Sequence, residues 1–292
     1  MKKRIALFGM MAVALIFSAC GGDSGNNGTE VDGISSSGGQ QSGFSSSSDF
    51  SSSASESSSS AKTVSLSSSL EASSSSAKVA EDYLNPNITY GEMTDTRDSQ
   101  TYKTVVIGTQ TWMAENLNFA DSVAIPNLKG NSWCYENSAD SCAKYGRLYT
   151  WTAAMNVASS YQLASASAVI STPQQGVCPS GWHVPTGAEW TTLENAVGSS
   201  DNAGTYLKAT SGWYSDAYHD GYGTDAYGFS ALPGGDHYGS DVINVGYYGL
   251  WWTATEYIST GAYYRTMSYG NTHVDTYLDN KKYGRSLRCL KD

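Results

Sequence analysis

A serine-rich segment near the amino-terminal end limits which part of this 292-residue chain can fold. Residues 35–76 contain 24 serines and few apolar side chains. A segment of this composition cannot bury enough surface to offset the entropy of ordering it. We therefore expect residues 20–81 to form a disordered Gly/Ser-rich linker, in which about sixty flexible residues span about 40 Å.

The residues before this linker have the layout of a secretory signal. Three basic residues precede an apolar run over residues 5–17, which is too short to cross a bilayer comfortably. The run is followed by two small residues and Cys20, and the string FSAC resembles a bacterial lipobox. The resemblance implies that residues 1–19 are removed as a signal peptide and that Cys20 is lipidated. An ordinary secreted protein with an unrelated cysteine is the alternative.

The remaining residues, 82–292, are numerous enough for one domain with a core, and they hold all eight tryptophans and all 21 tyrosines. Loss of the signal removes three basic residues, so the net charge moves from −10 to −13. An acidic domain without basic clusters argues against nucleic acid and anionic lipid as partners. We expect contact with the membrane only through the lipid anchor. Because residue 21 is Gly, not the Asp associated with inner-membrane retention, the outer membrane or cell surface is favoured.

Four cysteines remain beside Cys20, and an even number in an exported chain indicates two disulfides. Three pairings are possible. We favour Cys134–Cys142, which closes a short loop, and Cys178–Cys289, which ties the middle of the domain to its end. A four-cysteine zinc site is the alternative, but the spacings lack a close Cys-x-x-Cys pair.

Hydrophobic periodicity and turn residues predict a strand-rich α+β domain with small sheets, two or three short helices and long loops. The predicted elements are a hairpin within 101–113, a short helix from about Thr150, a helix over 187–197, a second helix over about 203–209, a strand over 249–257, a hairpin over 261–278 turning at Gly270-Asn271, and a closing strand over 283–290 with Leu287 and Cys289 facing inward.

The stretch GVCPSGWHVPTGAEW, residues 176–190, resembles a catalytic or metal site in composition, but its residues have structural explanations. Thr186 and Glu189 fit a capping box at the start of a helix. Only His183 has no assigned structural role. We expect the aromatic core to contain Trp112, Trp151, Trp190 and Trp251, and Glu115-Asn116 to be a buried polar pair that fixes a turn.

Six motifs, in order, resemble the Fibrobacter major paralogous domain (FISUMP): GTQTWMAENLN, YGRLYTWTAAMN, CPSGWHVPTGAEW, DAYGFSALPGG, GLWWTATEY and GRSLRCLKD. Proteins of this family are commonly exported lipoproteins with serine-rich linkers. The string WHVPTGAEW is also similar, more distantly, to the formylglycine-generating, sulfatase-modifying domain. That relation implies a C-type-lectin-like architecture, in which small sheets and helices support long surface loops.

The first functional hypothesis is a surface-anchored binding or adhesion module for polysaccharide, because sugar rings stack on Tyr and Trp while polar groups bind the hydroxyls. A Tyr-, Gly- and Asp-rich loop supplies the candidate ligand-binding residues Trp213, Tyr214, Tyr218, Tyr222, Asp225 and Tyr227. A structural or adhesive role with a cell-surface protein as partner is the alternative.

A cofactor and a catalytic role are not expected. The calcium-binding strings of C-type lectins are missing, and five aspartates, at 216, 220, 225, 236 and 241, match no defined calcium loop, although they could offer oxygen ligands. The adjacent pairs His219-Asp220 and Asp236-His237 are potential metal ligands, but such pairs are commonly solvated. An enzyme, either glycan-active or formylglycine-generating, is the less favoured alternative, because disulfides would occupy the cysteines and no nucleophile motif is present.

Overall fold

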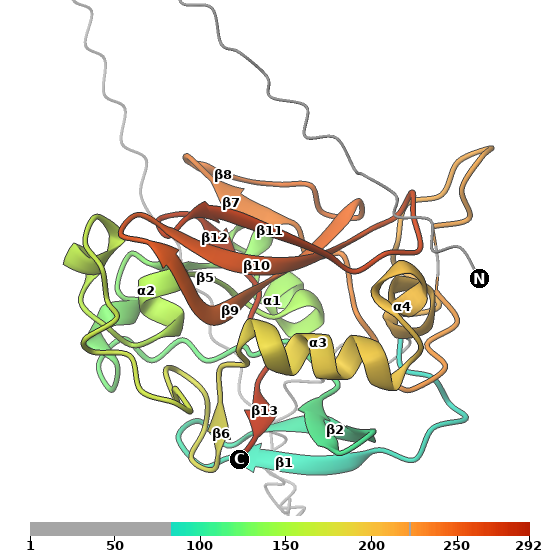
Figure 1. The fold of residues 1–292 in the computed structure, drawn as a ribbon, viewed down its shortest axis with the longest axis horizontal. Helices are drawn as coiled ribbons and strands as arrows, with labels where there is room; N and C mark the ends of the chain where they lie inside the picture. The colour runs from blue at the N-terminus through green and yellow to red at the C-terminus, as the bar shows by residue number, and fades with distance from the viewer. Residues whose placement is uncertain (1–82, 222) are drawn as a thin grey trace, which may run out of the picture. The chain divides into compact units, whose positions relative to one another are not determined.

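A computed structural model describes residues 83–221 and 223–292 of the chain (Figure 1). The predicted signal peptide, Cys20, the linker and Tyr222 lie outside these residues. Within the described ranges, every helix is too short or too polar to cross a membrane.

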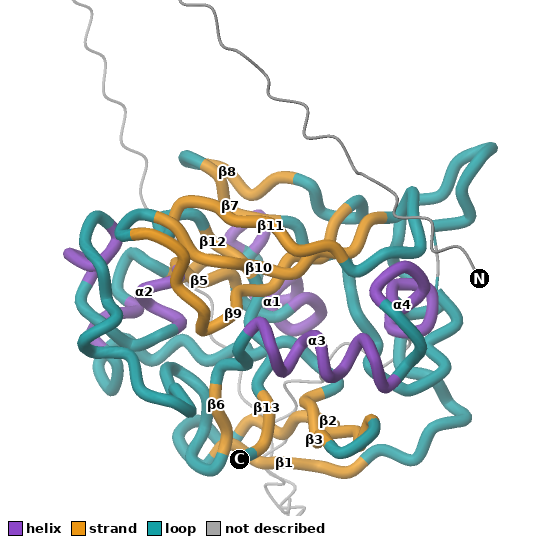
Figure 2. Tube along the Cα trace, in the orientation of Figure 1, coloured by secondary structure: helices purple, strands orange, loops and turns teal. Residues whose placement is uncertain are grey.

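The described residues form strand-rich α+β structure with small sheets, as predicted (Figures 1 and 2). One five-stranded sheet has the order β1-β2-β3-β13-β6, a second has the order β4-β5-β12-β7-β8, and a three-stranded sheet has the order β11-β10-β9. The strands are β1 Gly91–Asp95, β2 Gln100–Ile107, β3 Gln110–Met113, β4 Ser132–Trp133, β5 Leu148–Thr150, β6 Trp182–His183, β7 Asp236–Tyr238, β8 Asp241–Ile243, β9 Tyr248–Ile258, β10 Gly261–Ser268, β11 Asp275–Asn280, β12 Gly284–Arg285 and β13 Leu290–Lys291.

Short helices join the sheets. The described α-helices are α1 Ala139–Tyr145, α2 Trp151–Ala154, α3 Gly187–Ala196 and α4 Ser200–Leu207, and single 3-10 turns lie at Pro126–Leu128, Tyr135–Asn137 and Ser159–Gln162. The helices expected near 151, 187 and 203 are confirmed. Helix α1 was not expected, because it begins inside the short loop that a disulfide closes and has little apolar periodicity.

Both favoured disulfides are confirmed. Cys134 pairs with Cys142, and Cys178 pairs with Cys289 across 111 positions of sequence. The sulfurs of the second pair are fully buried, among core side chains. This disulfide therefore fixes the segment before β6 against the segment before β13.

The stretch 176–190 is the structural corner that its sequence suggests. Thr186 and Glu189 form the predicted capping box at the start of α3. The expectation that His183 has no structural role is wrong. Its Nδ1 lies 2.7 Å from Asp292 Oδ1, and its Nε2 lies 3.1 Å from Glu189 Oε1. The histidine thus joins β6, the cap of α3 and the segment after β13.

The core contains the predicted tryptophans. Trp112, Trp190 and Trp251 pack with ring centroids 5.1 and 5.9 Å apart, and Trp151 lies in a neighbouring cluster. In Figure 1, α3 runs between the β9–β11 sheet and the β1–β2 hairpin, which places Trp190 among side chains of both. Aromatic rings at these distances add specific attraction to the hydrophobic stabilisation of the core.

The predicted polar pair after the first hairpin is also buried. Asn116 Oδ1 accepts hydrogen bonds from Trp251 Nε1 at 2.8 Å and from Arg288 Nη2 at 2.9 Å, while its Nδ2 donates to Tyr145 O. Arg288 is 1% exposed and also donates to Phe229 O. Three distant segments therefore meet at the side-chain amide of Asn116.

Two predicted strand elements differ from the structure. Strands β10 and β11 pair antiparallel, but their last register pair is Thr266 and Asp275, so the turn is longer than the two residues expected at Gly270-Asn271. Lys208 of the segment after α4 donates to Ser268 O and Asn271 O in this longer turn.

The closing segment is not a single strand with alternating faces. Arg285, Ser286 and Arg288 are as buried as Leu287 and Cys289. Strand β12 lies inside one five-stranded sheet and β13 inside the other, and the guanidinium groups of Arg285 and Arg288 pack on the rings of Trp252 and Phe229.

Candidate functional site

Two of the candidate ligand-binding residues are buried and are corrected here to structural residues. Trp213 is 2% exposed, and its Nε1 donates to Ala231 O at 3.0 Å. Asp225 is fully buried and accepts hydrogen bonds from the Ser230 backbone N–H and hydroxyl, both at 2.7 Å. Burial raises the pKa of Asp225 to about 6. These residues hold the long loop onto the core.

The other described candidates lie at the surface but not at one point. Tyr214 stacks on Tyr247, with centroids 4.7 Å apart, and Tyr218 is 90% exposed. Tyr227 packs edge-on against Tyr206, in a separate hollow beside β2. The loop therefore distributes its tyrosines over different places.

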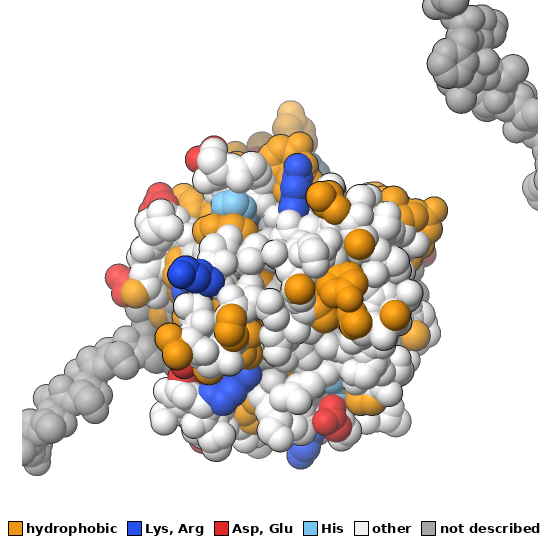
Figure 3. All heavy atoms as spheres, turned by 90° about the vertical axis from the view of Figure 1, so that its left-hand side faces the viewer, with side chains coloured by type: hydrophobic (Ala, Val, Ile, Leu, Met, Phe, Trp, Pro, Cys, Tyr) orange, Lys and Arg blue, Asp and Glu red, His pale blue; other side chains and the backbone are white. Residues whose placement is uncertain are grey.

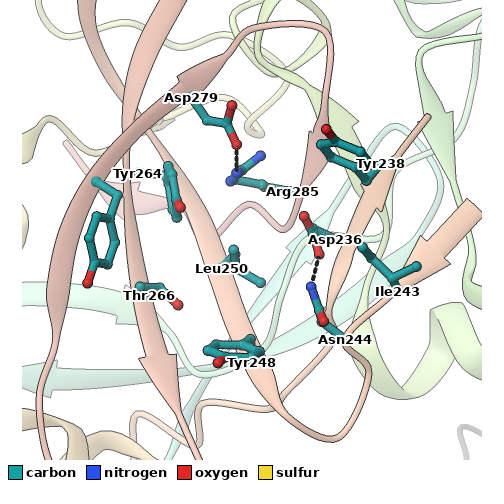
Figure 4. A pocket seen from close by; sticks show the side chains of 11 residues that line it. Asp236, Tyr238, Ile243, Asn244, Tyr248, Leu250, Tyr264, Thr266, Asp279 and Arg285 are labelled. Atoms are coloured by element: carbon teal, nitrogen blue, oxygen red, sulfur yellow. Dashed lines mark hydrogen bonds and ion pairs between the residues drawn. The ribbon is translucent and has the colours of Figure 1, made fainter.

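A pocket of about 340 Å³ lies elsewhere and combines aromatic with charged side chains (Figure 4). We call it the tyrosine pocket, and it is lined by Asp236, Tyr238, Ile243, Asn244, Tyr248, Leu250, Tyr264, Thr266, Tyr277, Asp279 and Arg285. Its size falls within the range of small-molecule sites.

The pocket forms where one face of the β9–β11 sheet meets the β7–β8 hairpin (Figures 1 and 4). Tyr264 of β10 pairs in register with Tyr277 of β11, and Thr266 pairs with Leu250 of β9. Residues directly opposite one another in antiparallel strands share a face, and alternate residues of one strand do so too. Strand pairing alone thus gathers these four side chains on one surface.

Arg285 of β12 lies beneath the aromatic rings of this pocket. Its guanidinium carbon lies 3.9 Å from the centroid of Tyr264 and 4.6 Å from that of Trp252. Its Nη2 donates to Asp279 Oδ2 at 2.7 Å, as Figure 4 shows. Although the side chain is 1% exposed, Nε and Nη1 have no hydrogen-bond partner among the described residues. A buried donor without a partner costs free energy, which a ligand oxygen recovers only if the side chains that cover these nitrogens shift.

Two further polar groups of the pocket are buried. The Thr266 hydroxyl has no partner among the described residues. Asp236 accepts a hydrogen bond from Asn244 Nδ2 at 2.8 Å, and burial raises the pKa of its carboxyl group. The pocket thus offers both donors and acceptors to a ligand.

Tyrosines form the outer part of the pocket. Tyr277 and Tyr238 are 54% and 52% exposed. Tyr238 stacks on Tyr283, with centroids 4.4 Å apart, and the hydrogen bond between the two phenols raises the pKa of Tyr283 to about 12. These rings present flat apolar surface above the buried charges.

Sequence reasoning missed this pocket because its residues come from six strands and form no recognised motif. The loop over residues 213–227 drew attention through its local density of tyrosine. The sequence signal for the pocket was weaker. It is the alternation of Tyr264 with Thr266 and of Tyr277 with Asp279, which places each pair on one face of a strand.

The five aspartates considered for calcium do not come together. Within residues 83–221 and 223–292, no three His, Cys, Asp or Glu side chains form a group that could hold a metal ion. Of the adjacent pairs, His219 binds Asp216 through Nδ1, and His237 stacks on Trp133 with centroids 3.7 Å apart.

Comparison with known proteins identifies a family. No curated protein and no solved structure matches the chain significantly. The family model of the Fibrobacter succinogenes major domain matches residues 105–291, which is more than half of the sequence. The match includes the β7–β12 region that builds the tyrosine pocket. The chain therefore belongs to the Fibrobacter succinogenes major domain family.

Proposed function

We propose that this protein is a lipid-anchored cell-surface module that binds neutral polysaccharide in the tyrosine pocket. The observation that carries the proposal is a buried arginine with unpartnered N–H groups beneath a rim of tyrosines. Sugar rings stack on tyrosine faces, and their hydroxyls hydrogen-bond to buried polar groups, directly or through one water.

The charges of the pocket support a neutral ligand. Two carboxylates, of Asp236 and Asp279, accompany the single guanidinium of Arg285. An anionic ligand would meet more negative than positive charge in this space. On the face that Figure 3 shows, Lys and Arg side chains lie apart from one another and form no basic patch. A neutral sugar chain fits this distribution better than nucleic acid does.

Affinity electrophoresis of the full-length chain through gels that contain soluble xylan, mixed-linkage β-glucan, glucomannan or hydroxyethyl cellulose tests the proposal. We expect at least one polymer to retard the chain. Tyr277→Ala should weaken this retardation about three- to tenfold, because it removes one stacking ring. Arg285→Lys should weaken it at least as much, since lysine keeps the charge but loses the planar set of donors.

Tyr257→Ala is the matched control, because Tyr257 is 52% exposed, like the rim tyrosines, but does not line the pocket. Thermal unfolding of each variant separates lost binding from lost folding. If no polymer retards the wild-type chain, or if Tyr257→Ala and Tyr277→Ala weaken binding equally, the proposal is wrong. Cross-links from Tyr277 to a cell-surface protein, without retention by polysaccharide, would favour the adhesive alternative.

One observation favours hydrolysis as a second candidate function. Two carboxyl groups line the pocket in different surroundings: burial raises the pKa of Asp236, whereas Asp279 is paired with Arg285. Glycosidases use two carboxyl groups beside the scissile bond, one of which acts as a protonated acid. New reducing ends released by the wild-type chain but not by Asp236→Asn would support hydrolysis. Retardation without release leaves binding as the function.

A further inference from the structure

We propose that a second site, beside the start of α3, binds the carboxylate group of a uronic acid, a sugar that carries an acid in place of its terminal alcohol. The site is separate from the tyrosine pocket and recognises a different chemical group. The proposal therefore goes beyond the function proposed above and does not depend on it.

A hollow of about 600 Å³ lies between the start of α3 and the β9–β11 sheet. We call it the threonine hollow, because five threonines line it together with Gly187, Ala188, Tyr263 and Arg265. Among the described residues that line it there is no Asp or Glu, and Arg265 supplies the charge. In a chain of net charge −10, a hollow whose lining charge is positive favours an anionic group.

Strand β10 separates the threonine hollow from the tyrosine pocket. Tyr263 and Arg265 line the hollow, whereas Tyr264 and Thr266 line the pocket. Successive residues of a strand point to opposite faces of its sheet. The two sites therefore lie on opposite faces of the β9–β11 sheet, and each can be tested without the other.

Arg265 is fixed by its hydrogen bonds and keeps one nitrogen for a ligand. Its Nε donates to Glu194 Oε1 at 2.7 Å, and its Nη2 donates to Gly187 O at 2.8 Å and to Thr191 Oγ1 at 3.0 Å. Its Nη1 has no hydrogen-bond partner in the part of the chain that the structure describes, although Arg265 is only 4% exposed. A donor held in place in this way loses little entropy when it binds.

The first turn of α3 offers a second donor beside this nitrogen. The backbone N–H of Gly187 donates to Thr255 Oγ1, and that of Glu189 donates to Thr186 Oγ1. The N–H of Ala188, between them, has no partner among the described residues, as is usual in a first helical turn. A Cβ atom at Gly187 would lie 4.0 Å from Arg265 Nη1, so the guanidinium is close to this turn. Helix start and guanidinium together suit a carboxylate.

The nearest carboxylates of the chain are already bound. Glu194 accepts from Arg265 Nε, and Glu189 accepts from the backbone and hydroxyl groups of Thr186 and contacts His183. Neither Glu194 nor Glu189 lines the hollow. The two free donors thus remain available to an acid from outside.

The rest of the lining suits a sugar ring. Tyr263 offers an aromatic face, on which sugar rings stack. Threonine hydroxyls both donate and accept hydrogen bonds, as sugar hydroxyls require. Thr276, which pairs in register with Arg265, and Thr172 are exposed, so the hollow opens to solvent. A volume of about 600 Å³ also exceeds what a carboxylate group alone would fill.

Titration calorimetry of the full-length chain with glucuronate, galacturonate, glucose, galactose and acetate tests the proposal. Each sugar acid differs from its neutral sugar at one carbon atom. We expect at least one sugar acid to bind about tenfold or more tightly than its neutral counterpart and than acetate, because it uses both the donors and the aromatic face. Trigalacturonate that binds more tightly than galacturonate would assign the acid to a polysaccharide chain, and equal binding would assign it to a free sugar acid.

Gly187→Asp should weaken binding of the sugar acid at least about tenfold, because it places a carboxylate of the chain itself in the hollow. A Cβ at this position meets only ordinary contacts, 3.6 Å from Thr255 Oγ1 and 4.0 Å from Arg265 Nη1, and an acid stabilises the first turn of a helix. Thr192→Asp is the matched control, since it adds the same charge at an exposed position of α3 outside the hollow. If thermal unfolding shows that Gly187→Asp is destabilised, Gly187→Ala, which adds one methyl group, replaces it and should weaken binding about threefold or more.

The outcomes separate this proposal from the proposed function. Tyr277→Ala should leave binding of the sugar acid unchanged, and Gly187→Asp should leave retardation by neutral polymers unchanged. Equal binding of acids and neutral sugars, equal binding of acetate, or wild-type binding by the Gly187 variants would overturn the proposal. So would a Tyr277→Ala chain that loses the sugar acid, because the acid would then bind in the tyrosine pocket.

Discussion

Arg285 and Arg288 are three positions apart and both 1% exposed, yet their surroundings assign them different roles. Arg288 donates to Asn116 and to Phe229 O, and burial lowers its pKa to about 10, so it stays charged at neutral pH. Arg285 is held by Asp279 but keeps two nitrogens without a partner. One arginine closes the core, and the other keeps two unused donors at the proposed binding site.

His183 should make stability depend on pH. Its pKa is raised, chiefly by the hydrogen bond to Glu189 and also by Asp292, while burial opposes the shift. A group whose pKa is raised on folding contributes its full stabilisation below its unfolded-state pKa, about 6.5. That stabilisation is lost as pH rises through its folded-state pKa. Chemically, a neutral imidazole donates from one nitrogen, whereas only the charged ring donates to both carboxylates.

The test is His183→Gln, followed by thermal unfolding between pH 5.5 and pH 9. We expect a loss of about 1–2 kcal/mol at pH 5.5, or about 2–8 °C in Tm, and a smaller loss at pH 9. Thr186→Ala, which removes the neighbouring cap, is the control and should cost about 1 kcal/mol at both pH values. A loss for His183→Gln that does not change with pH would contradict the role given to the charged ring.

At the scale of elements, a buried ion pair fastens α3 to β10. Arg265 Nε donates to Glu194 Oε1 at 2.7 Å, and Nη2 donates to Gly187 O at the start of the helix. Both charged side chains are about 5% exposed. Removing one partner of an ion pair buried in this way costs much free energy, because the other charge stays buried without a partner.

Arg265→Met should therefore destabilise the domain by about 3–5 kcal/mol, because it leaves the Glu194 carboxylate buried without its partner. The double variant Arg265→Met/Glu194→Leu should recover a large part of that loss. Urea unfolding of the wild type and the three variants, including Glu194→Leu alone, gives the coupling energy. Additive single effects would show that the pair does not join helix and strand.

Local patterns predicted the elements well where one segment determines its own structure. The capping box of α3, the helix that begins after Thr150 and strand β9 all follow from spacing within a few residues. The β10–β11 turn could not be predicted in this way, because its carbonyl groups bind Lys208 of a distant segment. The tyrosine pocket was harder still to predict, because its lining depends on the register between strands, and no single segment contains that information.

At the scale of the whole molecule, the two disulfides should differ in their effect on stability. In the chain-entropy model, closing a loop of about 110 residues contributes about 4–5 kcal/mol, and closing one of about nine contributes about 2–3 kcal/mol. The pairs observed, Cys178–Cys289 and Cys134–Cys142, have these two separations.

Replacing Cys178 and Cys289 by Ala should therefore lower the free energy of unfolding about 2 kcal/mol more than replacing Cys134 and Cys142. Both double variants keep one disulfide, so each serves as the control for the other in denaturant unfolding without reductant. An equal loss, or a larger loss for the short loop, would show that native-state packing rather than loop length governs the effect.

Residues 284–291 come after all the strands that they join, and they supply an inner strand to each five-stranded sheet. A ribosome therefore makes every other strand of these two sheets before the strands that complete them. Until this segment emerges, Cys178 has no Cys289 to pair with, and Asn116 has no Arg288. The order of synthesis thus delays closure of the domain until residues 284–291 have left the ribosome, so the strands made earlier wait for the segment that joins them.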